Sequence, residues 1–288
     1  MLSSISHFPR PTKTYHAKSY PRIAPKNVGF DGRGKTIFIT AGATGVGYAT
    51  ARAFCETGAS RIIIVSRSSG PQEKAKQELG AAYPSTEVVC YRVSVTDHVR
   101  INEVVREVGA IDVLVLSAAA SDNQFDDASK TKVVEVENVY LTNVVASFNL
   151  VQTYLNTPAP ARKTVLNLSS LSAHATVPNQ VGYGPSKAAV TQMMQHFAAE
   201  QTSGNVKIIS YHPGALYTEA VETMGIPKDV LEWEDIDLPA HFALWLSGPE
   251  SDFLHGRFVW AAWDVDELIE LKEKVAKDPR FLTIGLIQ

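Results

Sequence analysis

Two cysteines, Cys55 and Cys90, are the only thiols in the 288 residues, and both stand among apolar neighbours. So few cysteines exclude a disulfide-rich secreted scaffold, and we expect two buried, reduced thiols. No apolar run approaches the ~18 residues that a membrane span requires. A formal net charge of −3 and a pI near 6.2 provide no basic surface for nucleic acid. We therefore expect neither a membrane nor a nucleic-acid partner, and without a secretory apolar segment we expect a cytoplasmic protein.

Acidic side chains are missing from the first 30 residues, which carry five Lys or Arg and four prolines before Asp31. A basic, acid-free start is typical of a transit peptide. The prolines oppose the amphipathic helix that such a peptide needs. We expect residues 1–31 to form an extended arm that lies on the body of the protein or on a partner subunit, with a transit peptide as the alternative.

After residue 31, short apolar runs alternate with longer amphipathic stretches, without a repeat or a low-complexity linker. The expected strands are Thr36–Thr40, Arg61–Val65, Val88–Arg92, Val113–Ser117, Val165–Ser169, Lys207–Tyr211 and Arg257–Trp260. The expected helices are Val46–Thr57, Pro71–Leu79, His98–Val108, Lys132–Leu155, Tyr183–Ser203 and Ile236–Leu246. This α/β alternation predicts a Rossmann-type, doubly wound parallel sheet of about seven strands, with helices on both faces.

One domain is expected over residues 32–263, because no change of composition marks a boundary within it. The tail, residues 264–288, has apolar side chains at roughly helical spacing. It predicts one further amphipathic helix that ends near Asp278-Pro279.

The run TAGATGVG follows the first expected strand and leads into a helix. Its expected cofactor contacts are Thr40, Ala41, Gly42, Thr44, Gly45, Val46 and Gly47. Amides at a helix start favour a phosphate, and glycines allow close backbone approach. An ordinary strand-to-helix turn is the alternative. Ala41 adds a methyl group at the strand exit, and the sign of its φ is open.

The second expected strand ends at Ser66 and Arg67, where no acidic residue stands. In a dinucleotide-binding sheet an acid at this place binds the ribose 2′-hydroxyl of NAD. A guanidinium pairs instead with a 2′-phosphate. These two residues favour NADP over NAD, and a solvated surface arginine is the alternative.

Tyr183 and Lys187 are four residues apart in an expected helix, so their side chains share one face. A neighbouring cation lowers the pKa of a phenol, whose ordinary value is about 10. We expect Lys187 to lower the pKa of Tyr183, with help from an oxidised nicotinamide. The pair alone arises readily by chance.

Two further residues stand at informative spacings. Ser170 precedes Tyr183 by 13 positions, and Asn143 precedes Phe148 by five. With these, the chain from about Lys35 to Trp260 resembles the short-chain dehydrogenases/reductases, and most of all their fungal NADP-dependent members, some of which serve secondary metabolism. The resemblance implies the catalytic tetrad Asn143, Ser170, Tyr183 and Lys187. It implies that Ser170 binds a carbonyl oxygen, that Lys187 also holds the nicotinamide ribose, and that Asn143 holds a water.

The same resemblance extends the cofactor site. The family's Pro-Gly-x-x-x-Thr pattern stands here as Pro213, Gly214, Ala215, Leu216, Tyr217 and Thr218, in which the backbone and Thr218 would hold the carboxamide. Ser94 and Val95 replace an expected aspartate near the adenine. Leu116, Ser117, Ala118 and Ala119 replace an Asn-Asn-Ala-Gly sequence. Family members are usually dimers or tetramers through the helices expected at Lys132–Leu155 and Tyr183–Ser203.

The expected function is NADP(H)-dependent reduction of a ketone or aldehyde, or oxidation of the alcohol. Residues 217–238 are expected to form a lid over a bulky, weakly polar substrate, or an ordinary surface loop. Non-redox chemistry on the same fold and a non-catalytic NADP sensor are the alternatives. No metal is expected, because His174 and His212 are unclustered; His174 either touches substrate or packs against the body.

Overall fold

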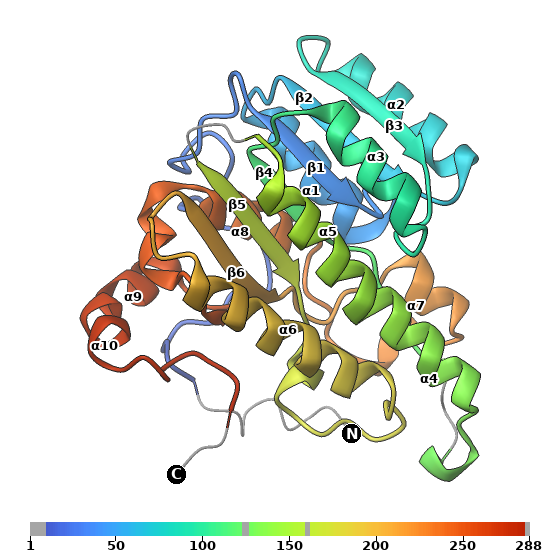
Figure 1. Ribbon diagram of the computed structural model, residues 1–288. Helices are drawn as coiled ribbons and strands as arrows, with labels where there is room; N and C mark the ends of the chain where they lie inside the picture. The colour runs from blue at the N-terminus through green and yellow to red at the C-terminus, as the bar shows by residue number, and fades with distance from the viewer. Residues whose placement is uncertain (1–9, 123–126, 159–161, 286–288) are drawn as a thin grey trace.

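The computed structural model describes residues 10–122, 127–158 and 162–285. Seven strands form one parallel sheet in the order β3-β2-β1-β4-β5-β6-β7 (Figure 1). Their bounds are β1 Thr36–Thr40, β2 Arg61–Ser66, β3 Glu87–Arg92, β4 Val113–Leu116, β5 Lys163–Leu168, β6 Val206–His212 and β7 Phe258–Trp260. The predicted doubly wound parallel sheet is confirmed.

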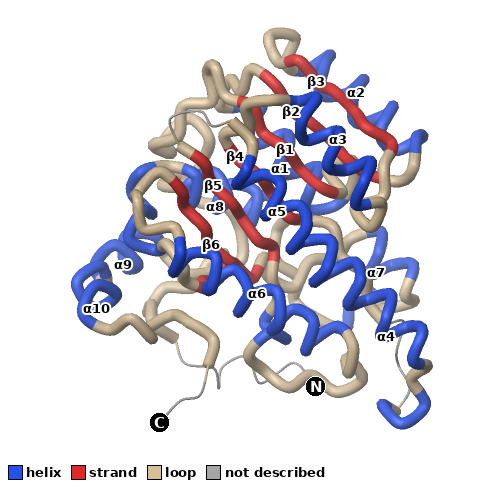
Figure 2. Tube along the Cα trace, in the orientation of Figure 1, coloured by secondary structure: helices blue, strands red, loops and turns tan. Residues whose placement is uncertain are grey.

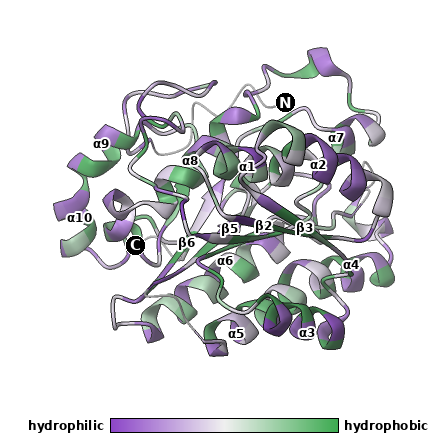
Figure 3. Cartoon of the chain, turned by 90° about the horizontal axis from the view of Figure 1, so that it is seen from above, coloured by the Kyte–Doolittle hydropathy of each residue, from purple (hydrophilic) through white to green (hydrophobic). Residues whose placement is uncertain are grey.

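Helices cover both faces of the sheet (Figure 3). On one side lie α1 (Gly45–Glu56), α2 (Ser69–Ala82) and α8 (Asp237–Ser247). On the other lie α3 (His98–Val108), α5 (Ala146–Asn156) and α6 (Tyr183–Glu200). Each face therefore has its own apolar core.

Strand β1 shows why the central strands are apolar throughout. Ile37 and Ile39 pack into the core that contains α1 and α8, whereas Phe38 packs into the core that contains α3, α5 and α6. All three are fully buried. Successive side chains of a strand point to opposite faces, so a strand covered on both sides needs an apolar residue at every position.

Several expected element boundaries are wrong. The stretch Lys132–Leu155 is not one regular α-helix, because α4 (Val133–Tyr140) and α5 are joined by a π-helical turn at Leu141–Val145. The tail contains two short helices, α9 (Val265–Glu270) and α10 (Lys272–Lys277), instead of one. Strand β4 ends before Ser117, because the Ser117 amide donates to the hydroxyl of Thr40 instead of continuing the ladder.

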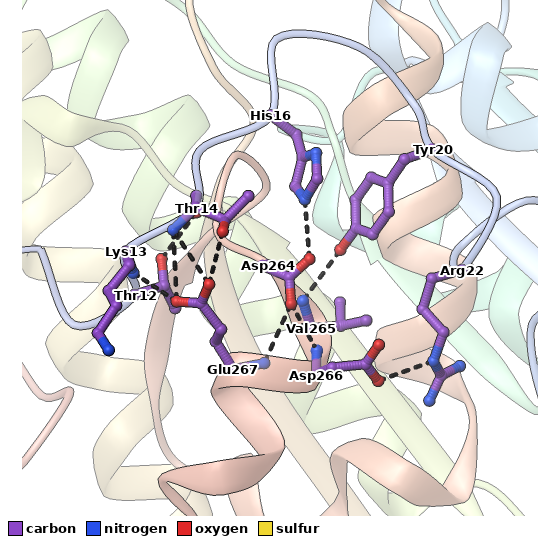
Figure 4. A network of polar contacts seen from close by, with 10 residues as sticks. All are labelled: Thr12, Lys13, Thr14, His16, Tyr20, Arg22, Asp264, Val265, Asp266 and Glu267. Atoms are coloured by element: carbon purple, nitrogen blue, oxygen red, sulfur yellow. Dashed lines mark hydrogen bonds and ion pairs between the residues drawn. The ribbon is translucent and has the colours of Figure 1, made fainter.

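Residues 12–22 lie beside the start of α9, so segments from the two ends of the sequence are neighbours (Figure 4). His16 Nε2 is 2.9 Å from the carboxylate of Asp264, and the Val265 amide donates to the hydroxyl of Tyr20 at 2.9 Å. Arg22 pairs with Asp266 and with Glu250. Ile23 is fully buried in the core that also holds α8. This arm is thus bound by polar contacts along its length and by one deeply inserted apolar side chain.

The loop between β1 and α1 shows the sign of φ at Ala41, which the sequence leaves open. Ala41 has φ 52°, in the left-handed region, and Gly45 has φ 55°. A Cβ atom on Gly47 would lie 2.4 Å from the carbonyl oxygen of Ala41, so the helix start touches the strand exit. Gly47 must be a glycine because any side chain there would collide with the backbone of Ala41. Ala41 itself is strained, because its backbone conformation is one that glycine adopts without cost.

Replacing Ala41 with glycine should stabilise the fold. Left-handed φ costs an alanine about 1–2 kcal/mol, and the added freedom of glycine in the unfolded chain costs about 0.4–1 kcal/mol. We expect Ala41→Gly to raise the free energy of unfolding in urea by about 0.5–1 kcal/mol.

Ala43, in the same loop, is the matched control because its φ is not positive. Ala43→Gly should lower the free energy of unfolding by about 0.4–1 kcal/mol. If both variants were destabilised equally, the left-handed conformation of Ala41 would be refuted.

Candidate active site

Most of the predicted site residues stand at or just after the carboxyl ends of β1, β4, β5 and β6. These four strands are neighbours in the sheet (Figure 2). The order of the strands reverses between β1 and β4. In an open parallel sheet this reversal leaves a crevice in which ligands bind. The hydroxyl of Thr40 joins the two strands there, because it accepts from the amides of Ser117 and Ala118, each at 2.9 Å.

Asn143 lies in the π-helical turn and is almost fully buried. Its Nδ2 donates to the carbonyl of Ala120 and to Ser186 Oγ, each at 2.9 Å, and its Oδ1 accepts from the Ala120 amide at 2.8 Å. A π-helical turn inserts one residue into a helix and often occurs at functional sites. Here it accompanies an asparagine that binds the segment after β4 to helix α6.

Ser170, Tyr183 and Lys187 come together from two elements. Ser170 follows β5, and its side chain is hydrogen-bonded to that of the half-buried Tyr183. The Lys187 ammonium lies 5.7 Å from the centre of the Tyr183 ring and donates to the Leu168 carbonyl at 2.8 Å. The four residues of the implied tetrad thus lie around the first turn of α6.

Burial governs the electrostatics of the pair. Burial raises the pKa of Tyr183, and its hydrogen bond with Ser170 opposes this rise only in part. Burial also lowers the pKa of Lys187 to about 8. In the protein without a cofactor, burial therefore raises the pKa of Tyr183, and the expected lowering by Lys187 together with an oxidised nicotinamide stays a prediction.

The two histidines have different surroundings. His212 is buried, its Nδ1 accepts from the Leu171 amide at 3.2 Å, and burial lowers its pKa to about 3. His174 is exposed, and its ring packs against Phe258 and Trp260. Trp260 Nε1 also donates to His174 Nε2 at 3.2 Å. Neutral His212 therefore supports the loop just after Ser170. Among the described residues, no group of three His, Cys, Asp or Glu side chains could hold a metal ion.

Helix α1 begins without a side-chain cap, because the Thr44 hydroxyl makes no bond to its first amides. A Cβ placed on Gly45 would lie 3.8 Å from Thr218 Cγ2, so the loop and the segment after β6 are neighbours. Uncapped amides at a helix start attract anions. The loop thus fits a pyrophosphate between α1 and the segment that includes Thr218.

The end of β2 offers a second place for a polar group. Ser66 Oγ is buried and has no hydrogen-bond partner among the described residues. Arg67 is exposed beside it, and no carboxylate in the described parts of the chain pairs with its guanidinium. Arg92, which the sequence reasoning did not single out, donates through Nε to the Arg67 carbonyl at 3.2 Å. A buried hydroxyl without a partner, followed in the chain by an exposed arginine, fits an anionic ribose substituent.

The segment after β3 makes only local contacts. The Ser94 hydroxyl is hydrogen-bonded to Thr96, two residues further along the chain, and Val95 between them is half-buried.

The segment after β6 is held by Glu234. Gly214 has φ 106°, and the Ala215 amide donates to Glu234 at 2.8 Å while the Glu234 amide donates back to the Ala215 carbonyl at 2.9 Å. Burial raises the pKa of Glu234. Glu234 thus supports this loop, although no sequence motif indicates it.

The expected lid, residues 217–238, contains α7 (Glu219–Thr223) and a short helical turn, Lys228–Val230. Tyr217 and Trp233 meet edge to face, with ring centres 5.3 Å apart, and Trp233 Nε1 donates to the Lys228 carbonyl. The Asp235 amide donates to the Ala17 carbonyl at 2.8 Å. The segment is therefore attached to the N-terminal arm at one end and to the segment after β6 at the other.

Comparisons with known proteins agree with this geometry. The family profile of the short chain dehydrogenases matches residues 35–228. "Short chain dehydrogenase/reductase AacuD" of Aspergillus aculeatus is 51% identical over 286 residues, which cover 99% of this chain and 100% of that relative. "Short chain dehydrogenase/reductase nsrO" of Aspergillus novofumigatus is 53% identical over 292 residues, again 99% and 100% of the two chains.

Solved structures are similar in fold. A short-chain dehydrogenase/reductase from Mycobacterium ulcerans has a TM-score of 0.73 at 20% identity, covering 81% of this chain and 89% of that one. A short chain dehydrogenase from Salmonella enterica has a TM-score of 0.74 at 18% identity, covering 84% and 99%. The matched profile, the two close relatives and the geometry of the site lead to one conclusion: the chain belongs to the short-chain dehydrogenase/reductase family.

Proposed function

We propose that this short-chain oxidoreductase reduces a ketone or aldehyde with NADPH, and that the same site oxidises the alcohol in reverse. The observation that carries the proposal is the hydrogen bond between Ser170 and Tyr183, with Lys187 close by, at the same carboxyl edge of the sheet as the glycine loop. Two neighbouring hydroxyl groups can both donate to the carbonyl oxygen of a substrate. The nearby cation suits the negative charge that this oxygen gains in the reaction.

In the proposed mechanism, Ser170 and Tyr183 bind the carbonyl oxygen of the substrate. When bound, the reduced nicotinamide would supply the hydride that reaches the carbonyl carbon. Tyr183 donates its proton to the oxygen as charge develops there, and the Lys187 ammonium stabilises the phenolate that remains. Lys187 would also hold the nicotinamide ribose, and Asn143 would help to return the proton from solvent, as the family resemblance implies.

The pKa directions support reduction as the working direction. Because burial raises the pKa of Tyr183, its phenol keeps a proton at neutral pH and is ready to donate it. Lys187, with a pKa lowered to about 8, is still mostly charged at pH 7. A protonated acid beside a charged lysine is the state that carbonyl reduction starts from.

Tyr183→Phe should remove nearly all turnover and leave cofactor binding intact. Loss of a positioned general acid typically costs 10²–10⁴ in rate. We expect NADPH consumption with a panel of bulky, weakly polar ketones to fall by about that factor. The dissociation constant for NADPH, from fluorescence titration, should change by less than about twofold because the ring remains.

Tyr83→Phe is the matched control, since Tyr83 lies at the end of α2 and bonds Glu56. A Tyr183→Phe enzyme that kept its rate would refute the assignment. NADPH binding by the wild type without turnover on any carbonyl would favour non-redox chemistry or a sensor.

We propose NADP over NAD because of what stands at the end of β2. The buried, unpartnered Ser66 hydroxyl and the free Arg67 guanidinium suit a 2′-phosphate, and no acid stands there to bind a 2′-hydroxyl. Arg92 lies close enough to bond the Arg67 backbone and adds positive charge to the same place.

Arg67→Ala should weaken NADPH binding selectively. A hydrogen bond to a charged group contributes about 1.5–3 kcal/mol, so the dissociation constant for NADPH should rise roughly tenfold to a hundredfold. The dissociation constant for NADH should stay within about twofold of the wild-type value, because NADH lacks the 2′-phosphate. Arg106→Ala, which removes an exposed arginine of α3, is the control. Equal losses for both cofactors, or none, would contradict the NADP assignment.

For the substrate we propose a bulky, weakly polar carbonyl compound. Tyr217 and Trp233 place aromatic surface on the proposed lid, which supports an apolar substrate. No helix in the described residues is long and apolar enough to span a membrane, and we propose the cytoplasm as the compartment. We also propose a role in fungal secondary metabolism, and the fungal origin of the close relatives supports the fungal part of this proposal.

We further propose that the chain forms a homodimer or homotetramer through α4, α5 and α6. Five apolar side chains lie exposed along α4, α5 and the turn between them: Val133 (73%), Val134 (63%), Leu141 (42%), Val145 (44%) and Phe148 (41%). They continue onto α6, where Phe148 meets Phe197 with ring centres 5.8 Å apart. Figure 1 shows α4 and α5 on the outside of the molecule, where a second copy can pack against the same helices.

Phe148→Glu should break this assembly. A charge at the middle of a two-fold apolar interface faces its own copy and has no partner. We expect light scattering after size exclusion to show a dimer or tetramer for the wild type and a smaller species for the variant. Val99→Glu, on exposed α3, should not change the mass. A monomeric wild type would refute the proposal.

A further inference from the structure

Asp122 is a buried carboxylate that the proposed mechanism does not use. It is 6% exposed, and its two oxygens accept from two backbone amides at the start of α6. Oδ2 accepts from Gly182 at 2.6 Å and Oδ1 from Tyr183 at 3.1 Å. The second of these amides belongs to the tyrosine that we assign as the acid.

Asp122 is not an ordinary helix cap, because it is 60 residues distant in sequence from Gly182. Local caps come from the residue directly before a helix. In α6 that position is Gly182, which has no side chain and makes no cap bond. A Cβ on Gly182 would lie 3.0 Å from Asp122 Oδ2, so the missing side chain leaves room for a carboxylate from another segment.

The segment 117–122 that carries Asp122 is attached at three points. At its start, the amides of Ser117 and Ala118 donate to the Thr40 hydroxyl at the end of β1. In its middle, the Ala120 amide and carbonyl are both bound by the Asn143 side chain. At its end, Asp122 binds the first amides of α6. The segment therefore links the strand that leads into the glycine loop to the residue that donates the proton.

We propose that Asp122 is a positioning residue that sets the backbone of Tyr183 relative to the cofactor loop. The inference rests on the proposed function, because it assigns Asp122 a part in aligning Tyr183 with the cofactor. A carboxylate suits this place because the start of a helix carries partial positive charge and because a charged acceptor makes the stronger hydrogen bonds. A displacement of the acid by about 1 Å can reduce a rate by about a hundredfold without a change in binding.

The test is Asp122→Asn, which keeps the volume but replaces one accepting oxygen with an NH₂ group that faces an amide. We expect kcat for carbonyl reduction to fall at least tenfold, while the dissociation constant for NADPH stays within twofold. Gly182→Ala should likewise lower kcat without changing the dissociation constant for NADPH, because its methyl group would contact the carboxylate. In the double variant the two losses should not add, since both act on one contact.

Asp264→Asn is the matched control. Asp264 also accepts from two backbone amides at a helix start, those of Asp266 and Glu267 in α9. The Asp264→Asn variant should have a lower free energy of unfolding but an unchanged kcat. The proposal is overturned if Asp122→Asn keeps kcat within twofold, or if NADPH affinity falls in proportion to kcat.

Amide hydrogen exchange keeps the proposal testable even if no carbonyl is reduced. Protection at Gly182 and Tyr183 in the wild type should be lost in Asp122→Asn and retained in Asp264→Asn. Failure of the wild type to turn over any carbonyl would count against the proposed function. Unchanged exchange at these two amides would count against Asp122.

Discussion

The hydroxyl of Thr40 makes the contact on which the arrangement of the site depends. It accepts from the amides of Ser117 and Ala118, where the strand order reverses between β1 and β4. Parallel strands diverge after such a reversal, because their connections cross opposite faces of the sheet. One side-chain oxygen thus joins the strand that leads into the glycine loop to the segment that reaches Asn143 and Asp122. The family's asparagines are absent after β4, and here a threonine on the neighbouring strand connects the two strand ends.

Several buried or half-buried polar side chains hydrogen-bond to the backbone of a distant segment. Asn143 binds both backbone groups of Ala120, Asp122 binds two amides of α6, and Glu234 binds the Ala215 amide. A buried polar group without a partner costs about 1–3 kcal/mol, so each of these side chains specifies one arrangement of the loops it joins. Ser66 is the contrast, since its buried oxygen has no partner in the described residues and is free for a ligand.

The parallel sheet and the spacing of the tetrad residues along the chain could be predicted from the sequence, whereas several features of the geometry could not. Apolar runs such as Thr36–Thr40 indicate doubly covered strands, and the spacing of Ser170, Tyr183 and Lys187 is visible along the chain. The positive φ of Ala41 is not visible, because alanine ordinarily avoids that region. A π-helical turn changes the helical period over five residues only, too few for a hydrophobic pattern to reveal. The contact from Asp122 to Gly182 spans 60 positions, and the raised pKa of Tyr183 comes from burial, which no local pattern reports.

The pairing of the N-terminal arm with α9 has a consequence for the order in which the protein folds. Thr14 and Glu267, which are hydrogen-bonded, are 253 residues apart. A chain that leaves the ribosome from its N-terminus must keep the arm undocked until nearly all of the sheet has been synthesised. The contacts between the arm and α9 can therefore form only near the end of synthesis, among the last steps of folding. Since the Ala17 carbonyl then receives the Asp235 amide, the lid segment acquires its final anchor only when the chain is almost complete.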